Sequence, residues 1–536
     1  MSRRSHVLFV AAVFMVVLVS TSLPYYTQWR SAPPGQQFGG LISSLSDQNT
    51  YLMWMRQAGE GHLLWRDLMT TDPHAPFYTN PLWLGLGALT RLGLSPLMVY
   101  HGARVAFMLL LLIALYALLG ALLPRVAERR VALAMMATGE GLFWVFFWLN
   151  RPSGGLLPAG TAAFGAPELL AWPSMALLPH FTAALAGMVT VFYLALAAYR
   201  REESWRRYAG LGGLVLALVA SFHVYDVVTV TAVLLVHWVM AFRAGKIPPH
   251  AHRALAAILL PGWAITILVG VMLQASPLGR AWSQANQMLS WSPFTYAVGL
   301  GVPLILALLD HRKLLHWRRM DLGQILVAVW LLVNGALLFT DGLIPWERRL
   351  MMGLQIPVVV LAVRNWGQYV VPRWMGVPAG RRGGAGGMSA VLAWGILLLL
   401  VWPGLGLRIA YYGHQPNYLS DDFRQVCARL ETLPRDQGVL SDAVLGNWIP
   451  QLSGQSVYLG HKELTPHFLE RRDQVQTFFE LTTTDRARRE LLATARCRWV
   501  VAEGEEREGL ASAVAEGLLL PELSLPSVTL YRVAGS

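Results

Sequence analysis

The sequence predicts an all-α polytopic membrane bundle with a small α/β domain at its C-terminal end. Of its 536 residues, 55% are hydrophobic and 14% are charged, whereas soluble globular domains carry about 25% charged residues. Long apolar runs, separated by charged or Pro/Gly-rich segments, recur up to residue 410. Residues 411–536 instead alternate short apolar stretches with polar helical ones. We therefore expect a membrane domain over 1–410 and a water-soluble domain over 411–536.

Eleven apolar runs, each bounded by charged residues or by Pro and Gly, are predicted to be membrane-spanning helices. They lie at about 7–23, 97–123, 131–149, 180–199, 208–222, 226–242, 254–273, 294–309, 322–340, 350–371 and 389–409. The first run follows a basic start, as in a signal peptide, but it lacks a small-x-small cleavage pattern and is interpreted as an uncleaved helix. A further apolar piece at 81–94 is too short to span the bilayer and is expected in the outer interface.

The segment 208–242 is divided into two helices because of the charges in the loops. As one helix it would be about 52 Å long at about 1.5 Å per residue, and the interruption Ser221–Asp226 (SFHVYD) offers a turn. With this turn, the Arg- and Lys-rich loops fall on one side of the membrane, which the positive-inside rule makes the cytoplasmic side. The N-terminus is then cytoplasmic. The other side receives the first outer loop (24–96), the C-terminal tail, and the loops 150–179, 221–226, 274–293 and 341–349.

The net charge of +12 does not indicate a nucleic-acid partner. Residues 413–536 carry a net charge of −4 and the rest of the chain +16. The basic excess therefore lies in the short loops of the membrane domain, where Lys and Arg set topology. The segment 376–388 (GVPAGRRGGAGGM) is predicted to be a flexible inner linker. Both cysteines, Cys427 and Cys497, lie in the tail, and the sequence leaves open whether they form a disulfide.

The first outer loop contains the longest polar interruption of the membrane domain, Phe38–Pro81. Asp47 is the residue that we assign to catalysis, and N-capping of the amphipathic segment 48–57 is its alternative role. Tyr51 and His74 accompany Asp47 in the loop and are predicted to bind substrate, since aromatic rings bind sugar faces and lipid head groups. The preference of Tyr for the membrane interface is the simpler explanation for Tyr51.

Ionisable residues also gather in the other outer loops. Glu168 is the one acid of a Pro/Gly-rich loop, and His180 begins the helix that follows. His223 and Asp226 flank the turn at the outer membrane edge, where such groups usually have a partner or a task; capping of the next helix is the alternative for Asp226. Glu140 lies midway along the third helix and is expected to face the bundle interior.

Two arginines on the outer side oppose the positive-inside trend. Arg348 and Arg349 start a helix there, and guanidinium groups clasp phosphates through paired hydrogen bonds. We therefore expect them to bind an anionic group, with an internal salt bridge to Glu347 or Asp341 as the alternative. Arg104, near the start of the second helix, is expected to contribute to the same binding.

Several motifs give the chain a family resemblance. They are SLSDQNTYLMWMRQ, TTDPHAPFYTNPLWLGLGAL and SPLMVYHGARV, followed by LLPHFTAAL, FHVYDVV, WERRLMMGLQIP and GNWIPQLSGQSVYLGH. In these the chain resembles the GT-C superfamily of polyprenyl-phosphate-dependent glycosyltransferases, which includes bacterial mannosyl- and aminoarabinosyltransferases. The likeness is to a bacterial branch of that superfamily and covers almost the whole chain.

The resemblance implies a multi-pass enzyme of the bacterial inner membrane. It would move a sugar from a polyprenyl-phosphate donor to an extracytoplasmic lipid, glycan or protein, with Asp47 as general base. The Arg348–Arg349 pair would stabilise the leaving phosphate, and the groups in the outer loops are expected to face one cavity. A transporter or flippase for a lipid-linked substrate is the alternative, as is a non-catalytic assembly protein of the same fold.

The resemblance assigns no metal ligand in this chain and requires no cofactor, but it leaves room for a divalent metal. Many relatives carry two adjacent acids in the first loop, whereas this chain has Asp47 followed by Gln48. The second acid is therefore missing from the loop, and Glu168 is the residue that would supply it from the second outer loop.

Overall fold

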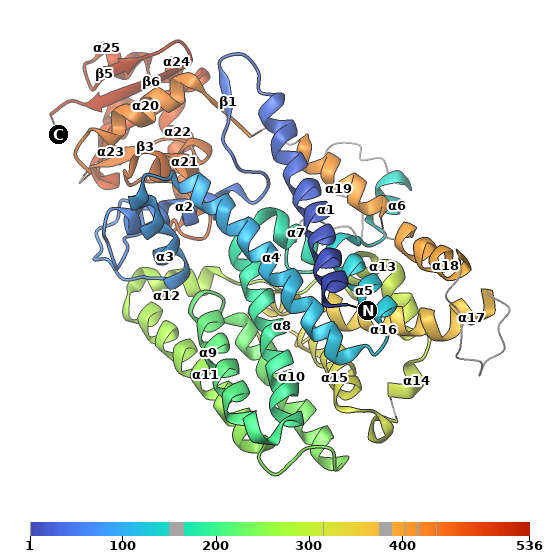
Figure 1. Ribbon diagram of the computed structural model, residues 1–536. Coiled ribbons are helices and arrows are strands. Elements are labelled where there is room, and N and C mark those ends of the chain that lie inside the picture. The colour runs from blue at the N-terminus through green and yellow to red at the C-terminus, as the bar shows by residue number, and fades with distance from the viewer. Residues whose placement is uncertain are drawn as a thin grey trace. The chain divides into compact units, whose positions relative to one another are not determined.

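The computed structural model describes residues 2–149, 164, 166–314, 316–374, 388–400, 402–414, 417–435 and 437–535. The chain forms two compact units (Figure 1). The helical unit comprises Met1–Pro24, Gly102–Val269 and Gln287–Tyr412, and the mixed unit comprises Tyr25–His101, Gly270–Asn286 and Gly413–Ser536. The predicted linker, apart from Met388, and residues 150–163 and 165 of the second outer loop lie outside the described residues.

Long apolar helices build the helical unit, as the sequence predicts. Within the described ranges, seven helices are long and apolar enough to cross a membrane. They are α1 (Arg3–Arg30), α4 (Pro96–Leu122), α8 (Pro179–Arg200), α10 (Tyr225–Arg243), α11 (Ala251–Ala275) and the stretches Glu347–Val370 and Trp394–Gly413. Two shorter apolar helices are α13 (Pro293–Leu308) and α15 (Leu322–Leu337). Each of the eleven predicted runs coincides with one helix or with consecutive helical pieces.

The remaining elements of this region are shorter. The helices are α5 (Val126–Thr138), α6 (Phe143–Leu149), α7 (Ala171–Leu177), α9 (Trp205–Phe222), α14 (His311–Leu314), α16 (Gln355–Asn365), α17 (Val371–Trp374), α18 (Met388–Leu399) and α19 (Pro403–Gly413). Among the described residues, short turns of other helix types are η3 (Glu202–Ser204), η4 (Trp317–Arg319), η5 (Glu347–Met351) and η6 (Trp366–Val370).

The predicted helix 131–149 is interrupted between α5 and α6, and glycines explain the break. A Cβ at Gly141 would lie 2.2 Å from the carbonyl oxygen of Gly299 in α13, so only glycine allows this approach. α13 is kinked at Gly301, whose φ is 57°, and a Cβ there would lie 2.9 Å from the Cα of Gly141. The apolar pattern predicts the span, but not that two glycine breaks pack against each other.

The C-terminal part of the mixed unit is a small α/β domain, as predicted. Its sheet has the order β3-β4-β6-β5, in which β3 and β4 are parallel and the other neighbours antiparallel. The strands are β3 (Gly438–Leu440), β4 (Cys497–Glu503), β5 (Leu519–Ser524) and β6 (Val528–Val533). The helices are α20 (Asp421–Glu431), α21 (Ala443–Ser453), α22 (Phe468–Phe479), α23 (Asp485–Ala495), α24 (Glu505–Gly509) and α25 (Ala511–Ala515).

Two details of this domain differ from the sequence pattern. The apolar stretch 457–461 forms an isolated bridge from Val457 to Val439 rather than a strand. β5 is not evident from the apolar pattern because it contains a proline and a glutamate. Cys427 and Cys497 are both buried and free, so the tail is held together by its core rather than by a disulfide.

The first outer loop packs with the C-terminal domain inside the mixed unit. Its strand β1 (Gln36–Phe38) pairs antiparallel with β2 (Tyr418–Ser420), and its helix α2 (Leu45–Gly59) packs on α21. The short helix α3 (Pro81–Leu89) follows, as the apolar piece 81–94 predicts. The aromatic side chains of the loop share one hydrophobic core with residues of β4 and β6.

A contact inside the mixed unit bears on the predicted membrane topology. The indole Nε1 of Trp282, in α12 (Pro277–Ala285), donates to the Asp67 carboxylate of the first loop at 3.2 Å. An even number of crossings must therefore separate these segments. The predicted turn in 208–242 is present, since α9 ends at Phe222 and α10 begins at Tyr225. A single helix over this range would make the number of crossings odd.

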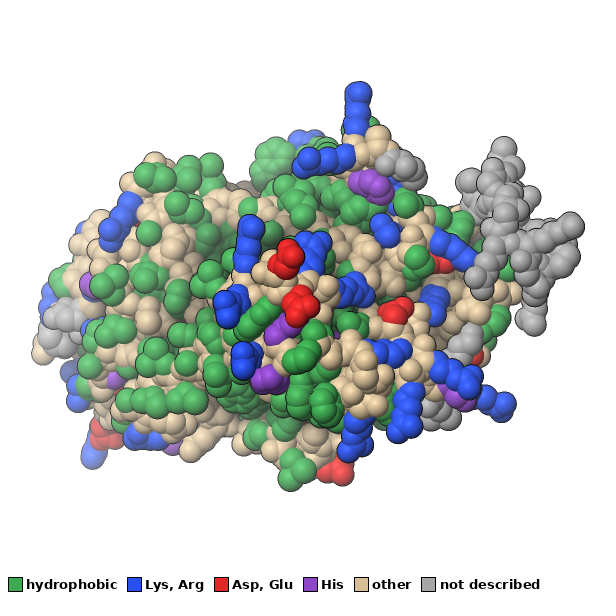
Figure 2. Space-filling view, turned by 60° about the horizontal axis from the view of Figure 1, so that its bottom comes forward, with side chains coloured by type: hydrophobic (Ala, Val, Ile, Leu, Met, Phe, Trp, Pro, Cys, Tyr) green, Lys and Arg blue, Asp and Glu red, His purple; other side chains and the backbone are tan. Residues whose placement is uncertain are grey.

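Basic side chains mark one end of the helical unit. Figure 2 views the protein from the side that carries the turn between α10 and α11, and Lys and Arg side chains outnumber acidic ones there. The exposed arginines of the two adjoining loops are Arg200, Arg201, Arg206, Arg207, Arg243 and Arg253. These two loops belong to the Arg- and Lys-rich set that the sequence predicts on one side of the membrane.

Candidate functional site

Asp47 lies in the first turn of α2, two residues after the helix begins at Leu45. The N-cap position belongs to Ser44, so Asp47 is not the capping residue. Ser43 and Ser44 both have positive φ, 57° and 46°, a conformation that costs non-glycine residues free energy and is common at functional sites. Gln48 supports this turn, because its buried side-chain amide donates to the carbonyl oxygens of Ile42 (3.1 Å) and Ser43 (2.5 Å).

Two residues of the C-terminal domain accompany Asp47. The Nε2 atom of His461 lies 3.3 Å from the Asp47 carboxylate, and one donor atom each of Asp47, His461 and Glu463 lie within 4.8 Å of one another. The Asp47 side chain is 42% exposed and the His461 side chain 6%. The sequence reasoning missed His461 and Glu463 as site residues, although the motif GNWIPQLSGQSVYLGH ends on His461.

Asp47, His461 and Glu463 are candidates for holding a divalent metal, but their hydrogen bonds do not fit one. A metal-bound histidine binds through an unprotonated nitrogen and donates its other N–H. Here Nδ1 of His461 accepts the backbone N–H of Glu463 at 3.0 Å. The ring proton therefore belongs on Nε2, which faces Asp47. The side-chain amide of Gln48, the residue after Asp47, donates to backbone carbonyl groups. We therefore derive the chemistry without a metal.

Asp67 is a second notable carboxyl group of the mixed unit. It is buried, and its two oxygens accept from the backbone N–H of Met69 (2.8 Å) and from Trp282 (3.2 Å). Burial raises the pKa of Asp67 to about 7. The sequence gives no signal for this, because nothing in a polar loop tells which acid will be covered by a distant segment.

The two substrate-binding candidates of the first loop have structural contacts. His74 accepts the backbone N–H of Asp67 through Nε2 (3.0 Å) and is 2.7 Å from the carbonyl oxygen of Asp72 through Nδ1. Burial lowers the pKa of the His74 imidazole. Tyr51 stacks on Trp83 with ring centroids 4.5 Å apart. Both residues hold the loop together, and their role toward a substrate stays a prediction.

In the helical unit, four of the predicted residues come together around a fifth, Arg349. Its Nη1 donates to the buried Glu168 carboxylate at 2.6 Å. Its guanidinium lies over the ring of Phe181, 5.9 Å from the centroid. The rings of His180 and His223 are 4.3 Å and 5.2 Å from the same Phe181 ring. Nδ1 of His223 lies 3.0 Å from the Asp226 carboxylate. We call Glu168, His180, His223, Asp226 and Arg349 the Arg349 group.

Glu347, one of the two expected alternative partners of the arginine pair, is hydrogen-bonded to backbone groups. The Glu347 carboxylate accepts the backbone N–H groups of Ser290 (2.9 Å) and Thr340 (3.1 Å). The guanidinium of Arg348 lies over the indole of Trp291, 4.7 Å from the ring centroid. Arg349 is paired with Glu168, so this ion pair joins η5 to the segment before α7.

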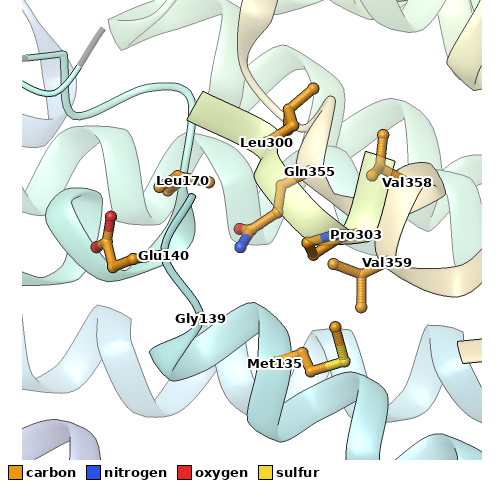
Figure 3. A pocket seen from close by; sticks show the side chains of 9 residues that line it. All are labelled: Met135, Gly139, Glu140, Leu170, Leu300, Pro303, Gln355, Val358 and Val359. Carbon is orange, nitrogen blue, oxygen red and sulfur yellow. The ribbon is translucent and has the colours of Figure 1, made fainter. Parts of the chain in front are cut away.

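Two further charged residues tie helices of the helical unit to one another. Arg104 of α4 donates to the hydroxyl groups of Thr21 (3.2 Å) and Ser22 (3.5 Å) on α1. Glu140 faces the interior, as expected, and its carboxylate accepts from Arg408 of α19 at 2.8 Å. Figure 3 shows Glu140 at the edge of a cavity of about 10 Å³. That volume holds about one water molecule, so this cavity cannot accept a sugar.

The fold is similar to that of several solved membrane proteins. AglB, an oligosaccharyltransferase of Archaeoglobus fulgidus solved with an inhibitory peptide and a dolichol-phosphate, matches with a TM-score of 0.57 at 12% identity, over 100% of this chain and 77% of AglB. ArnT of Cupriavidus metallidurans, bound to undecaprenyl phosphate, matches with a TM-score of 0.50 at 13% identity, over 100% and 99% of the two chains. The mycobacterial arabinofuranosyltransferase AftD matches with a TM-score of 0.56 at 14% identity, over 100% of this chain and 40% of AftD.

These likenesses confirm the fold that the sequence motifs imply, a GT-C type membrane domain with an appended smaller domain. No family model matches the sequence, and neither does a curated protein. The similarity therefore resides in the three-dimensional arrangement, and activity has to be argued from the residues of this chain.

Proposed function

We propose that this protein is an integral-membrane glycosyltransferase that moves a sugar from a polyprenyl-phosphate donor to an extracytoplasmic acceptor. The observation that carries the proposal is the fold, shared along the whole chain with AglB, solved with dolichol-phosphate, and ArnT, solved with undecaprenyl phosphate. The acceptor is a lipid, a glycan or a protein. The presence of Asp47 at the N-terminal turn of α2, on the first outer loop, supports the same reading.

Asp47 acts as the general base in this reaction. Its carboxylate takes the proton of the acceptor hydroxyl, whose oxygen forms a new bond to the anomeric carbon of the sugar. The bond between that carbon and the lipid phosphate breaks, and the phosphate leaves with the electron pair. The exposure of the Asp47 side chain, at 42%, supports this role, since a base must reach its substrate.

Arg348 and Arg349 stabilise the phosphate as it leaves. Guanidinium groups are suited to phosphate oxygens, and negative charge on the phosphate grows as the sugar departs. Arg349 is paired with Glu168 in the structure. A phosphate that binds Arg349 therefore competes with the Glu168 carboxylate. His180 and His223 lie beside the Phe181 ring that Arg349 also contacts, and they are suited to receive the displaced carboxylate.

The proposed location is the bacterial inner membrane, with the N-terminus cytoplasmic and the C-terminal domain extracytoplasmic. The basic end of the helical unit supports this orientation through the positive-inside rule. The mixed unit supports a common side for the first loop and the tail, because β1 pairs with β2.

Release of lipid phosphate is the direct test of the proposal. Purified protein in proteoliposomes would be incubated with a panel of polyprenyl-phosphate sugars, with and without extracts that contain candidate acceptors. We expect one donor to be cleaved, with free lipid phosphate as a product. Movement of an intact donor between leaflets, with no cleavage of any donor, would support the flippase alternative and overturn the proposal.

A further inference from the structure

The turn from His461 to Glu463 is held firmly against the first outer loop. The hydroxyl of Thr465 accepts the backbone N–H of Gly460 at 3.1 Å and donates to the carbonyl oxygen of Met69 in the first loop at 2.8 Å. The side-chain amide of Asn447, on α21, donates to the carbonyl oxygen of Gly460 at 3.2 Å. The first outer loop and α21 therefore both fix the backbone on which His461 stands.

The tautomer of His461 follows from its two neighbours. The backbone N–H of Glu463 points at Nδ1 from 3.0 Å, so this nitrogen must offer a lone pair. The proton of the neutral ring then resides on Nε2, 3.3 Å from the Asp47 carboxylate. Both contacts are satisfied together only in this tautomer, because a proton on Nδ1 would face the proton of the Glu463 amide.

We propose that His461 is the positioning residue for Asp47, so that the C-terminal domain completes the catalytic site of the membrane enzyme. The Nε2–H group donates to the Asp47 carboxylate and fixes its direction at the start of α2. The inference rests on the proposed function, in which Asp47 is the general base, and it assigns the C-terminal domain a direct part in that function. It also makes His461 a hydrogen-bond donor rather than a metal ligand.

The chain also provides the second acid that its first loop lacks. The carboxylate of Glu463 lies near both Asp47 and His461, whereas Glu168, the acid expected to take this place, is bonded to Arg349. The backbone N–H of Glu463, and not its side chain, sets the tautomer of His461. A change of the Glu463 side chain therefore distinguishes a hydrogen-bonded chain from a metal site. It would leave the hydrogen bonds of His461 in place, but it would remove a ligand from a metal site.

Replacements of His461 by the two amides give a matched test. Glutamine places an N–H₂ group near the position of Nε2, so His461→Gln can still donate to Asp47. Asparagine reproduces the position of Nδ1 and can still accept the Glu463 N–H, but it does not reach Asp47. His62→Gln, at an exposed position of the first loop, is the control. Apparent Tm values of all variants would show that each one is folded.

We expect the two amide variants, His461→Gln and His461→Asn, to differ in kcat. A hydrogen bond to a charged group contributes about 1.5–3 kcal/mol, so His461→Asn should lose roughly 10- to 100-fold in kcat, and His461→Gln should recover most of the loss. His62→Gln should equal the wild type. Equal kcat values for wild type and His461→Asn, or equal losses for both amide variants, would overturn the positioning role.

The tautomer itself is measurable without turnover. Nitrogen-15 NMR of the full chain, labelled in histidine and assigned with His461→Gln, should show Nε2 protonated and Nδ1 unprotonated, and Glu463→Gln should keep this pattern. Equilibrium dialysis against Zn²⁺ and Mn²⁺ is the second arm. A bound ion that is lost in both His461→Gln and Glu463→Gln, or a proton on Nδ1, would refute the inference.

The two readouts separate this inference from the proposed function. If no donor is cleaved by the wild type but the NMR tautomer is as expected, the proposed function fails and the contact between His461 and Asp47 stands. If a donor is cleaved and Asp47→Asn abolishes cleavage while His461→Asn has no effect, the proposed function stands and the positioning role fails.

Discussion

Asp67 is a carboxyl group whose burial changes how the protein responds to pH. Its pKa rises from 3.8 to about 7, chiefly because burial disfavours the charged form. The folded state therefore keeps the proton at pH values where the unfolded chain has lost it. The resulting contribution to stability is fully present below about pH 4, decreases as the pH rises, and is lost above about pH 7. At about 1.4 kcal/mol per pKa unit the whole effect is roughly 4 kcal/mol.

The first prediction concerns Asp67→Asn. The amide carries no charge, so we expect the difference in apparent Tm between wild type and variant to favour the wild type at pH 5 and to shift steadily toward the variant up to pH 8. Thermal unfolding in detergent, followed by tryptophan fluorescence, measures this difference. Asp473→Asn, at an exposed site of the same unit, is the control. A difference that does not vary with pH would show that the Asp67 pKa is ordinary.

The second prediction concerns the ion pair between Glu168 and Arg349. The Glu168 side chain is 5% exposed and that of Arg349 is 18% exposed, so removal of one partner deprives a largely buried charge of this ion pair. Glu168→Gln and Arg349→Gln should each lower stability by about 3 kcal/mol. The double variant should lose less than the sum of the two. SDS titration of the purified proteins measures these values, and additive losses would indicate that the pair is not coupled.

At the scale of elements, α21 positions the turn that carries His461. Gly446 allows α21 to approach this turn, because a Cβ there would lie 1.9 Å from the carbonyl oxygen of Leu459. The third prediction is that Gly446→Ala destabilises the C-terminal domain by about 1–3 kcal/mol and also reduces turnover. Val444→Ala, at a position 64% exposed on the same helix, is the control and should have little effect. Wild-type stability of Gly446→Ala would contradict the packing that we describe.

The sequence predicts elements well where composition alone decides. All eleven apolar runs are helical, and the turn at His223 follows from loop charges. The interruption before Gly141 is less predictable, because its cause is the backbone of Gly299, which lies far along the chain. The apolar pattern records that a segment is membrane-embedded, but not which neighbour it touches.

The candidate site likewise contains residues that the sequence singles out and residues that it does not. Residues of the Arg349 group are recognisable from the sequence because ionisable residues are rare at the membrane edge. His461, Glu463 and Asp67 are not, because their significance comes from tertiary contacts. His461 meets Asp47 across 414 positions of sequence, and the tail gives no periodic signal for such a pairing.

At the scale of the whole molecule, the contacts of the mixed unit imply a membrane topology. The fourth prediction is that single cysteines at His62, Gln284 and Glu505 react with a membrane-impermeant maleimide from outside the cell, whereas cysteines at Arg206 and Arg253 do not. All five positions are exposed. The native Cys427 and Cys497 give a low background, since both are buried and burial raises the pKa of their thiols. Labelling of Gln284→Cys from the opposite side to Glu505→Cys would contradict the topology.

The central claim is that Asp47 is the base of a glycosyl transfer from a polyprenyl phosphate, and turnover by Asp47→Asn tests it most directly. The assay follows release of lipid phosphate from the donor that the wild type cleaves, with Asp473→Asn as the matched control. Loss of a general base costs about 10²- to 10⁴-fold in rate. We expect a loss of this size in Asp47→Asn, with its folding and donor binding retained, and wild-type turnover in the control. Undiminished turnover in Asp47→Asn would contradict the account.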